Sequence, residues 1–233
     1  IEQANTASEN RDYDRAFSLI DTGIAALGDG EAFRTAKDAV LAALKADYVA
    51  QTTEYEKNEA YDKALECVSF ALTYLPDDYE LKGIQSRVNA ASVVQKAIAR
   101  AADYANKQEY AKLFSSLDKA IDDVSDSTTA TASLKLTYDN YMKEYMELIE
   151  TQTTGLSTTE EYETAVKLLT SAVEIFPNDY DLKSQLANAE EMTVATRAIT
   201  EAAGCAGRSE YAALFPLLSD AMEELPAGSD AYQ

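Results

Sequence analysis

Residues 61–82 form the stretch that decides the fold, and they read YDKALECVSFALTYLPDDYELK. A related stretch, YETAVKLLTSAVEIFPNDYDLK, follows 101 positions later at residues 162–183. Both stretches keep the opening tyrosine, two alanines and a proline near the end. Internal duplication at a fixed period is typical of arrays of helical units, each of which cannot bury its apolar face alone. We therefore expect a helical repeat protein.

A tyrosine opens each of five copies of this pattern, at successive spacings of 48, 49, 52 and 49 residues. The five are Tyr13, Tyr61, Tyr110, Tyr162 and Tyr211. The positions three, seven and ten residues after each tyrosine share one face of a helix. The last of these positions is always small: Gly23, Ala71, Ala120, Ala172 and Ala221. A small side chain lets a second helix approach closely, so each tyrosine is predicted to open a short, tightly packed helix.

The predicted short helices end at glycine, proline or serine, and the following helices are capped at once. The end positions are Gly28, Pro76, Ser125, Pro177 and Pro226. Three pairs have the spacing of an N-cap and its N3 partner: Asp77 with Glu80, Asn178 with Asp181, and Thr158 with Glu161. Long helices are expected between the short ones, over 31–57, 78–107, 128–153 and 179–203.

Apolar residues at helical spacing define the expected core face of the long helices. They are Leu81, Ile84, Val88, Ala91, Ile98, Ala102 and Ala105, then Leu134, Tyr138, Tyr141, Tyr145 and Leu148, then Leu182, Leu186, Ala189, Ile199 and Ala202. Residues 1–8 match the tail of such a helix, and we expect the chain, which begins at Ile1, to be part of a longer protein. We expect one helical-repeat domain, 1–233, with repeats at 9–57, 58–107, 108–157, 158–207 and 208–233.

Two copies share four residues at the same spacing: Tyr61, Ala64, Ala71 and Pro76, and then Tyr162, Ala165, Ala172 and Pro177. This combination resembles the second-helix signature of tetratricopeptide repeats. The other copies depart from it, with Leu113 and Leu214 replacing the first alanine, and Gly28 or Ser125 replacing the proline. The family repeats every 34 residues, so the spacing here implies lengthened first helices. There the family's Trp, Leu and Gly are not recognisable, although Tyr55 falls at its tyrosine position.

The resemblance implies an all-α fold, an α–α superhelix or solenoid of about five helical hairpins that is tetratricopeptide-like with lengthened first helices. By analogy it also implies binding and scaffolding.

The composition limits the classes of molecule that the chain is expected to bind. Lys and Arg number 20 against 41 Asp and Glu, which gives a net charge of -21. So acidic a surface repels nucleic acid and anionic membranes, and any charge preference would favour a cationic partner. No apolar run has the length of a membrane span, so we expect no membrane insertion within this chain. The sequence has no His, which removes the usual metal ligand and neutral-pH acid or base.

Several groups of residues are candidate sites. Tyr138, Tyr141 and Tyr145, beside Met142 and Met146, form either a ligand surface or core packing, and the same alternatives hold for Tyr48, Tyr55 and Tyr104. Asp122, Asp123 and Asp126 lack the spacing of a calcium loop, so a solvated helix end is expected. A turn is expected at Asp29-Gly30-Glu31. Adjacent residues on a helix do not face each other, so acid–base pairing is not expected within Glu160-Glu161 or Glu190-Glu191. Cys67 is expected to be a buried thiol, and Cys205 is expected to be an unpaired thiol.

We therefore assign no catalytic, cofactor-binding or metal-binding residues and expect no cofactor. The favoured function is a non-catalytic scaffold that binds a protein or peptide, as the exposed repeat domain of a larger bacterial surface or membrane-anchored protein. Two alternatives stay open: an enzyme of the α/α-toroid type, and a receptor domain for a small ligand or short peptide. An extracellular or cell-surface location is expected, with a cytoplasmic one as the alternative.

Overall fold

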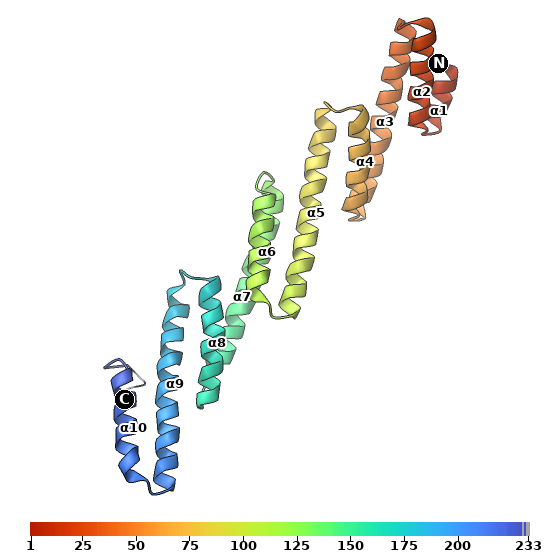
Figure 1. The fold of residues 1–233 in the computed structure, drawn as a ribbon. Coiled ribbons are helices and arrows are strands. Elements are labelled where there is room, and N and C mark those ends of the chain that lie inside the picture. Colours follow the sequence, from red (N-terminus) through yellow and green to blue (C-terminus); the bar gives the residue numbers. More distant parts are fainter. Residues whose placement is uncertain (230, 232–233) are drawn as a thin grey trace. The chain divides into compact units, whose positions relative to one another are not determined.

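The computed structural model describes residues 1–229 and 231, and the regular elements in this part of the chain are ten α-helices (Figure 1). From α2 onward, short and long helices alternate along the chain. The short helices are α1 (Glu2–Glu9), α2 (Tyr13–Leu27), α4 (Tyr61–Tyr74), α6 (Tyr110–Asp123), α8 (Thr159–Ile175) and α10 (Tyr211–Glu224). The long helices are α3 (Glu31–Lys57), α5 (Tyr79–Asn106), α7 (Thr128–Thr153) and α9 (Tyr180–Gly207). The predicted all-α class is confirmed.

The repeat tyrosines mark the starts of the short helices, as the spacing predicts. Four of them are the first residue of their helix, in α2, α4, α6 and α10. Helix α8 begins earlier, at Thr159. The predicted ranges 31–57 and 128–153 match α3 and α7.

A left-handed residue precedes four of the five tyrosines by two positions. Arg11, Glu59, Gln108 and Ser209 have φ angles of 63°, 56°, 56° and 61°. The next residue donates its N–H back into the preceding helix, as in the bond of 2.9 Å from Ala60 to Tyr55. This is a Schellman-type helix end, which usually takes glycine. The sequence uses other residues, so the turns carried no glycine signal.

The fifth turn is longer and explains the spacing of 52 between Tyr110 and Tyr162. It runs through Gly155, which has a φ of 73°, to Thr158. Thr158 Oγ1 accepts a hydrogen bond from the Glu161 N–H, and the Glu161 carboxylate accepts one from the Thr158 N–H at 3.0 Å. The predicted capping box of Thr158 and Glu161 is confirmed.

The other two predicted caps were wrong by one residue. Asp78, not Asp77, accepts the capping bond from the Leu81 N–H, at 3.0 Å. Likewise Asp179, not Asn178, accepts bonds from the N–H groups at 181 and 182. In both turns the residue directly after the proline belongs to the turn. The backbone N–H of the following residue, Asp78 or Asp179, donates a hydrogen bond to the carbonyl at the end of the short helix, and this following residue is the cap.

The chain divides into two compact units, the first comprising 1–100 with 118–135 and the second 101–117 with 136–233. In the first unit α1 packs on α2 and α3, α2 on α3, and α3 on α4. In the second unit α9 packs on both α8 and α10. Sequential packing of neighbouring helices is the arrangement that a helical repeat predicts.

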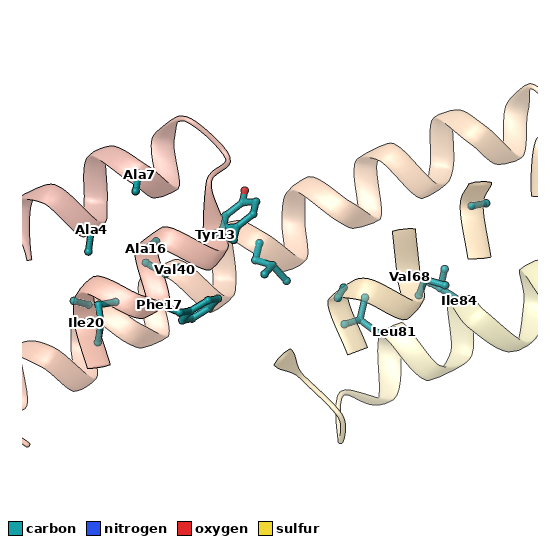
Figure 2. Close-up of a cluster of buried hydrophobic side chains, with 14 of the residues drawn as sticks. Ala4, Ala7, Tyr13, Ala16, Phe17, Ile20, Val40, Val68, Leu81 and Ile84 are labelled. Atoms are coloured by element: carbon teal, nitrogen blue, oxygen red, sulfur yellow. The ribbon is translucent and has the colours of Figure 1, made fainter. Parts of the chain in front are cut away.

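The predicted faces of the short helices form the core of the first unit (Figure 2). Ala16, Ile20, Val68 and Ala71 are fully buried. Val68 belongs to the same buried cluster as Leu81 and Ile84 of the next helix (Figure 2). A Cβ atom at position 23 would come too close to the Phe33 ring, so any larger residue there would force this ring to move.

The predicted core face of the long helices was partly wrong. Ile98 is 37% exposed and Ile199 is 63% exposed, whereas Ala97 and Ala198 beside them are buried. A long helix packs on one neighbour along its first half and on another along its second, as α9 does with α8 and α10. The buried stripe therefore moves around the helix, and a single periodicity cannot follow it.

Candidate functional site

The tyrosine stripe of α7 packs into the core of the second unit. Tyr145 is buried, and its ring stacks on Tyr110 with 4.1 Å between centroids. Tyr138 meets the ring of Phe114 edge-on at 5.0 Å. Burial raises the pKa of Tyr145 to about 12. The core interpretation is confirmed for Tyr145, while Tyr141 is half-buried beside a shallow hollow.

Met142 and Met146, beside this stripe, are half-buried.

The other candidate tyrosines lie against neighbouring side chains. Tyr48 stacks on Phe70, with 4.9 Å between centroids, and burial raises its pKa. Tyr55 lies under the ammonium group of Lys63, 5.8 Å from the ring centroid. Tyr104 is half-buried near the end of α5.

The acidic candidates occupy helix ends and exposed faces. Asp122, Asp123 and Asp126 are exposed at the end of α6, and the described residues contain no cluster of three or more potential metal ligands. Asp29 forms an ion pair with Arg34 at 3.2 Å.

The adjacent glutamate pairs have separate surroundings. Backbone hydrogen bonds from Ser157 and Thr158 hold the pKa of Glu161 below its ordinary value, while its neighbour Glu160 is exposed. Glu190 is exposed on α9, and Glu191 is half-buried.

Cys67 and Cys205 are both free thiols. Cys205 is buried, whereas Cys67, which was expected to be buried, is only half-buried. Partial burial raises the pKa of the Cys67 thiol, which disfavours the reactive thiolate.

A groove of about 480 Å³ lies along the middle of α5 in the first unit. Ligand sites commonly have volumes of roughly 300–1,000 Å³. Three elements line the groove: residues 87–98 of α5, the start of α7 and the turn between α3 and α4. Its lining comprises Glu59, Tyr61, Arg87, Ala90, Ala91, Val94, Gln95, Ile98, Ser127, Thr129, Ala130 and Ser133.

Small side chains create this groove. Ala90 and Ala91 are adjacent on α5 and Val94 lies one turn further on, and the groove is also lined by the alanine and hydroxyl residues that open α7. Ile98, half-exposed, supplies the largest apolar side chain of the floor. Met192 lies 101 positions after Ala91 in the sequence, so the second copy has a longer side chain at this repeat position.

Polar groups at the edge of the groove are held in place. Arg87 makes two bonds to the Glu56 carboxylate, with N–O distances of 3.0 and 2.9 Å. Gln95 donates to the Glu59 carbonyl at 3.3 Å, which ties α5 to the turn before α4. The Glu59 side chain is exposed at the entrance. The groove is therefore apolar inside, with a fixed rim that carries an exposed carboxylate.

The sequence prediction did not identify this groove. It assigned both Ala91 and Ile98 to the core face of a long helix. The available signal was the concentration of small residues in two separate segments, 90–97 and 127–133, and only the fold brings those segments together.

Within the part of the chain that the structure describes, no helix combines the length and apolar character that crossing a membrane requires. Comparison of the chain with protein-family models, curated proteins and solved structures found no match.

Proposed function

We propose that the chain is a non-catalytic protein- or peptide-binding scaffold whose binding site is the groove along α5. The observation that carries the proposal is the groove's combination of small apolar floor residues with a fixed polar rim. Such a surface suits an apolar side chain or a short amphipathic helix, which contributes affinity by burying its apolar face.

The charge of the chain favours a basic partner. A net charge of -21 attracts cations over distances comparable to the Debye length, about 8–10 Å in physiological salt. Glu59 places one carboxylate at the entrance of the groove. We propose a partner segment with apolar residues on one face and lysine or arginine on the other.

The repeat family and the location of the chain are part of the same proposal. We propose that the helical hairpins are five tetratricopeptide-like repeats with lengthened first helices, and that the chain serves at an extracellular or cell-surface site of a bacterial protein. The repeated tyrosine–alanine–alanine–proline pattern supports the first statement, and the acidic composition motivates the second.

A labelled amphipathic peptide of leucine and lysine is the probe that tests the groove, with binding followed by fluorescence anisotropy. Ala91→Trp fills the floor with an indole ring, and Ile98→Lys adds a repelling charge. Each should weaken binding by about tenfold or more, which corresponds to about 1.4 kcal/mol.

Asn89→Trp is the matched control, because Asn89 is exposed on α5 but does not line the groove. It should leave the affinity within about twofold of the wild type, which is less than about 0.5 kcal/mol. Equal affinity of all four proteins would refute the groove as the binding site. A peptide in which serine replaces leucine measures the purely electrostatic contribution.

A further inference from the structure

The sequence pattern of residues 1–57 recurs 97 positions later without a gap. The same aromatic contact occurs in both copies. It joins Tyr13 to Tyr48 in the first copy and Tyr110 to Tyr145 in the second, with 6.1 and 4.1 Å between ring centroids. The two copies can therefore be compared residue by residue.

In the first copy an arginine covers a carboxylate of the long helix. Arg11, in the turn after α1, forms an ion pair with Asp47 of α3 at 3.1 Å. The Asp47 side chain is only 9% exposed, and it also accepts a hydrogen bond from the Gln51 amide at 3.1 Å. A guanidinium group of the same chain thus matches the charge of this carboxylate.

Ion pairs also join other short helices to the long helix that follows them. Asp62 of α4 pairs with Lys96 of α5 at 2.6 Å, and Glu163 of α8 pairs with Arg197 of α9 at 2.9 Å. A charged link between the two helices of a hairpin is therefore a recurring feature of this array.

The second copy keeps the carboxylate but has no guanidinium group. Gln108 stands at the position of Arg11, and Glu144 stands at the position of Asp47. The backbone is left-handed at both turn residues, with φ angles of 63° at Arg11 and 56° at Gln108. An arginine at position 108 would therefore have the same path to α7 that Arg11 has to α3.

No cation pairs with Glu144 among the residues that the structure describes, and its side chain is exposed. Two lysines lie close to it or to Gln108 in the sequence, but each has another partner. Lys107 pairs with Asp103 at 2.6 Å, and Lys143 pairs with Glu147 at 3.7 Å.

A hollow of about 430 Å³ lies beside Glu144, and all of its lining residues belong to the second unit. Asn106 and Asn140 contribute side-chain amides, and Tyr141 contributes a half-buried ring. Amide oxygens accept hydrogen bonds, and the face of a tyrosine ring attracts a cation. The lining therefore offers a carboxylate, two amide acceptors and an aromatic face to one cationic group.

We propose that this hollow binds the arginine side chain of a partner protein. The partner would supply the guanidinium group that Arg11 supplies within the first copy. Charge complementarity identifies the occupant, and a planar guanidinium group can donate two hydrogen bonds to the Glu144 carboxylate while it stacks on the Tyr141 ring. The proposal does not depend on the groove along α5, which belongs to the first unit.

Fluorescence anisotropy with a labelled peptide of alternating glycine and arginine tests the proposal on the whole chain. Glu144→Gln should raise the dissociation constant about fivefold or more, because it removes the carboxylate. Gln108→Arg should have a similar effect, because its guanidinium group fills the hollow from within. Glu147→Gln is the matched control, since it makes the same change in net charge at an exposed position outside the hollow, and it should stay within about twofold of the wild type.

Equal dissociation constants for Glu144→Gln and Glu147→Gln would overturn the proposal, because overall charge would then account for the binding. Wild-type affinity of Gln108→Arg would also overturn it. A peptide with lysine in place of arginine should bind more weakly, and equal affinity would refute a site for guanidinium. Ala91→Trp, in the groove along α5, should leave the arginine peptide within about twofold of the wild type, so that failure of either site is recognised separately.

Discussion

Single residues at helix ends determine where the repeats turn. Asp78 caps α5 and also forms an ion pair with Lys45, with 2.7 Å between the charged atoms. The Lys45 contact and the Leu81 N–H hold the pKa of Asp78 below its ordinary value. Its neighbour Asp77 is almost fully exposed and contacts only the flexible end of Lys82 among the polar groups described.

These contacts predict different costs for two adjacent substitutions. Asp78→Ala should lower the free energy of unfolding by about 1–2 kcal/mol, because the cap is lost. Asp77→Ala should change it by less than about 0.5 kcal/mol. Urea titration measures both.

The cap also predicts a pH dependence. Because the folded-state pKa of Asp78 is lowered, its stabilisation is present above the unfolded value of about 4 and is lost as pH falls through the folded value. The difference in the free energy of unfolding between wild type and Asp78→Ala should therefore disappear in acid. A gap that is constant from neutral pH into acid would exclude a role for the ionised carboxylate.

Tyr145 predicts a loss of stability in base. Its folded-state pKa of about 12 lies above the unfolded value of about 10, so stability should fall as pH rises from 10 towards 12. The phenolate absorbance should show this tyrosine ionising late, together with unfolding. Tyr145→Phe should remove part of the pH dependence, and an early ionisation of Tyr145 in the folded protein would contradict its burial.

The left-handed turn residues predict a stabilising substitution. A left-handed conformation costs a non-glycine residue roughly 1–2 kcal/mol, and glycine loses about 0.5–1 kcal/mol in backbone entropy. Gln108→Gly should therefore raise the free energy of unfolding by about 0.5–1 kcal/mol, and Gln108→Ala should not. Thermal denaturation of the two variants distinguishes relief of strain from loss of the glutamine side chain.

At the scale of helices, the small positions of the short helices set the distance to their neighbours. Ala71 of α4 and Ala172 of α8 are completely buried, at the same place in their units. A larger side chain at either position has no free volume and must displace the facing helix.

Ala71→Leu should lower the free energy of unfolding by about 1–3 kcal/mol. Thr73→Leu on the exposed face of the same helix should change it by less than about 0.5 kcal/mol. The comparison uses chemical denaturation of both variants, and equal effects would mean that the face of Ala71 is not a packing surface.

The starts and buried faces of the helices could be predicted where a single residue type marks them. The repeat tyrosines fixed the starts of four short helices, and the small positions at Ala71, Ala120 and Ala172 lie on buried faces. The caps were predicted one residue early because Asp77 and Asp78 are chemically alike, and only the turn geometry selects between them. Ile98 was misplaced because it lines the groove beside α5, and periodicity within one helix does not show which apolar positions a neighbouring helix leaves uncovered.

At the scale of the whole chain, the two copies of the repeat keep their packing positions and differ at one lining residue of the groove. The packing positions are retained between the units, as at Ala71 and Ala172, whereas Ala91 of the groove is replaced by Met192 in the second copy. The groove could not be predicted, since its two walls come from segments separated by about thirty residues of helix and turn, and the volume between them depends on tertiary packing.

The most direct test of the binding proposal is nuclear magnetic resonance of isoleucine and valine methyl groups during titration with the leucine–lysine peptide. Ile98 and Ile199 are equivalent in the repeat, and Ile199 is the more exposed of the two. The groove proposal predicts saturable shifts at Val94 and Ile98, with Ile199 unchanged. Equal shifts at Ile98 and Ile199, or none at Ile98, would contradict it.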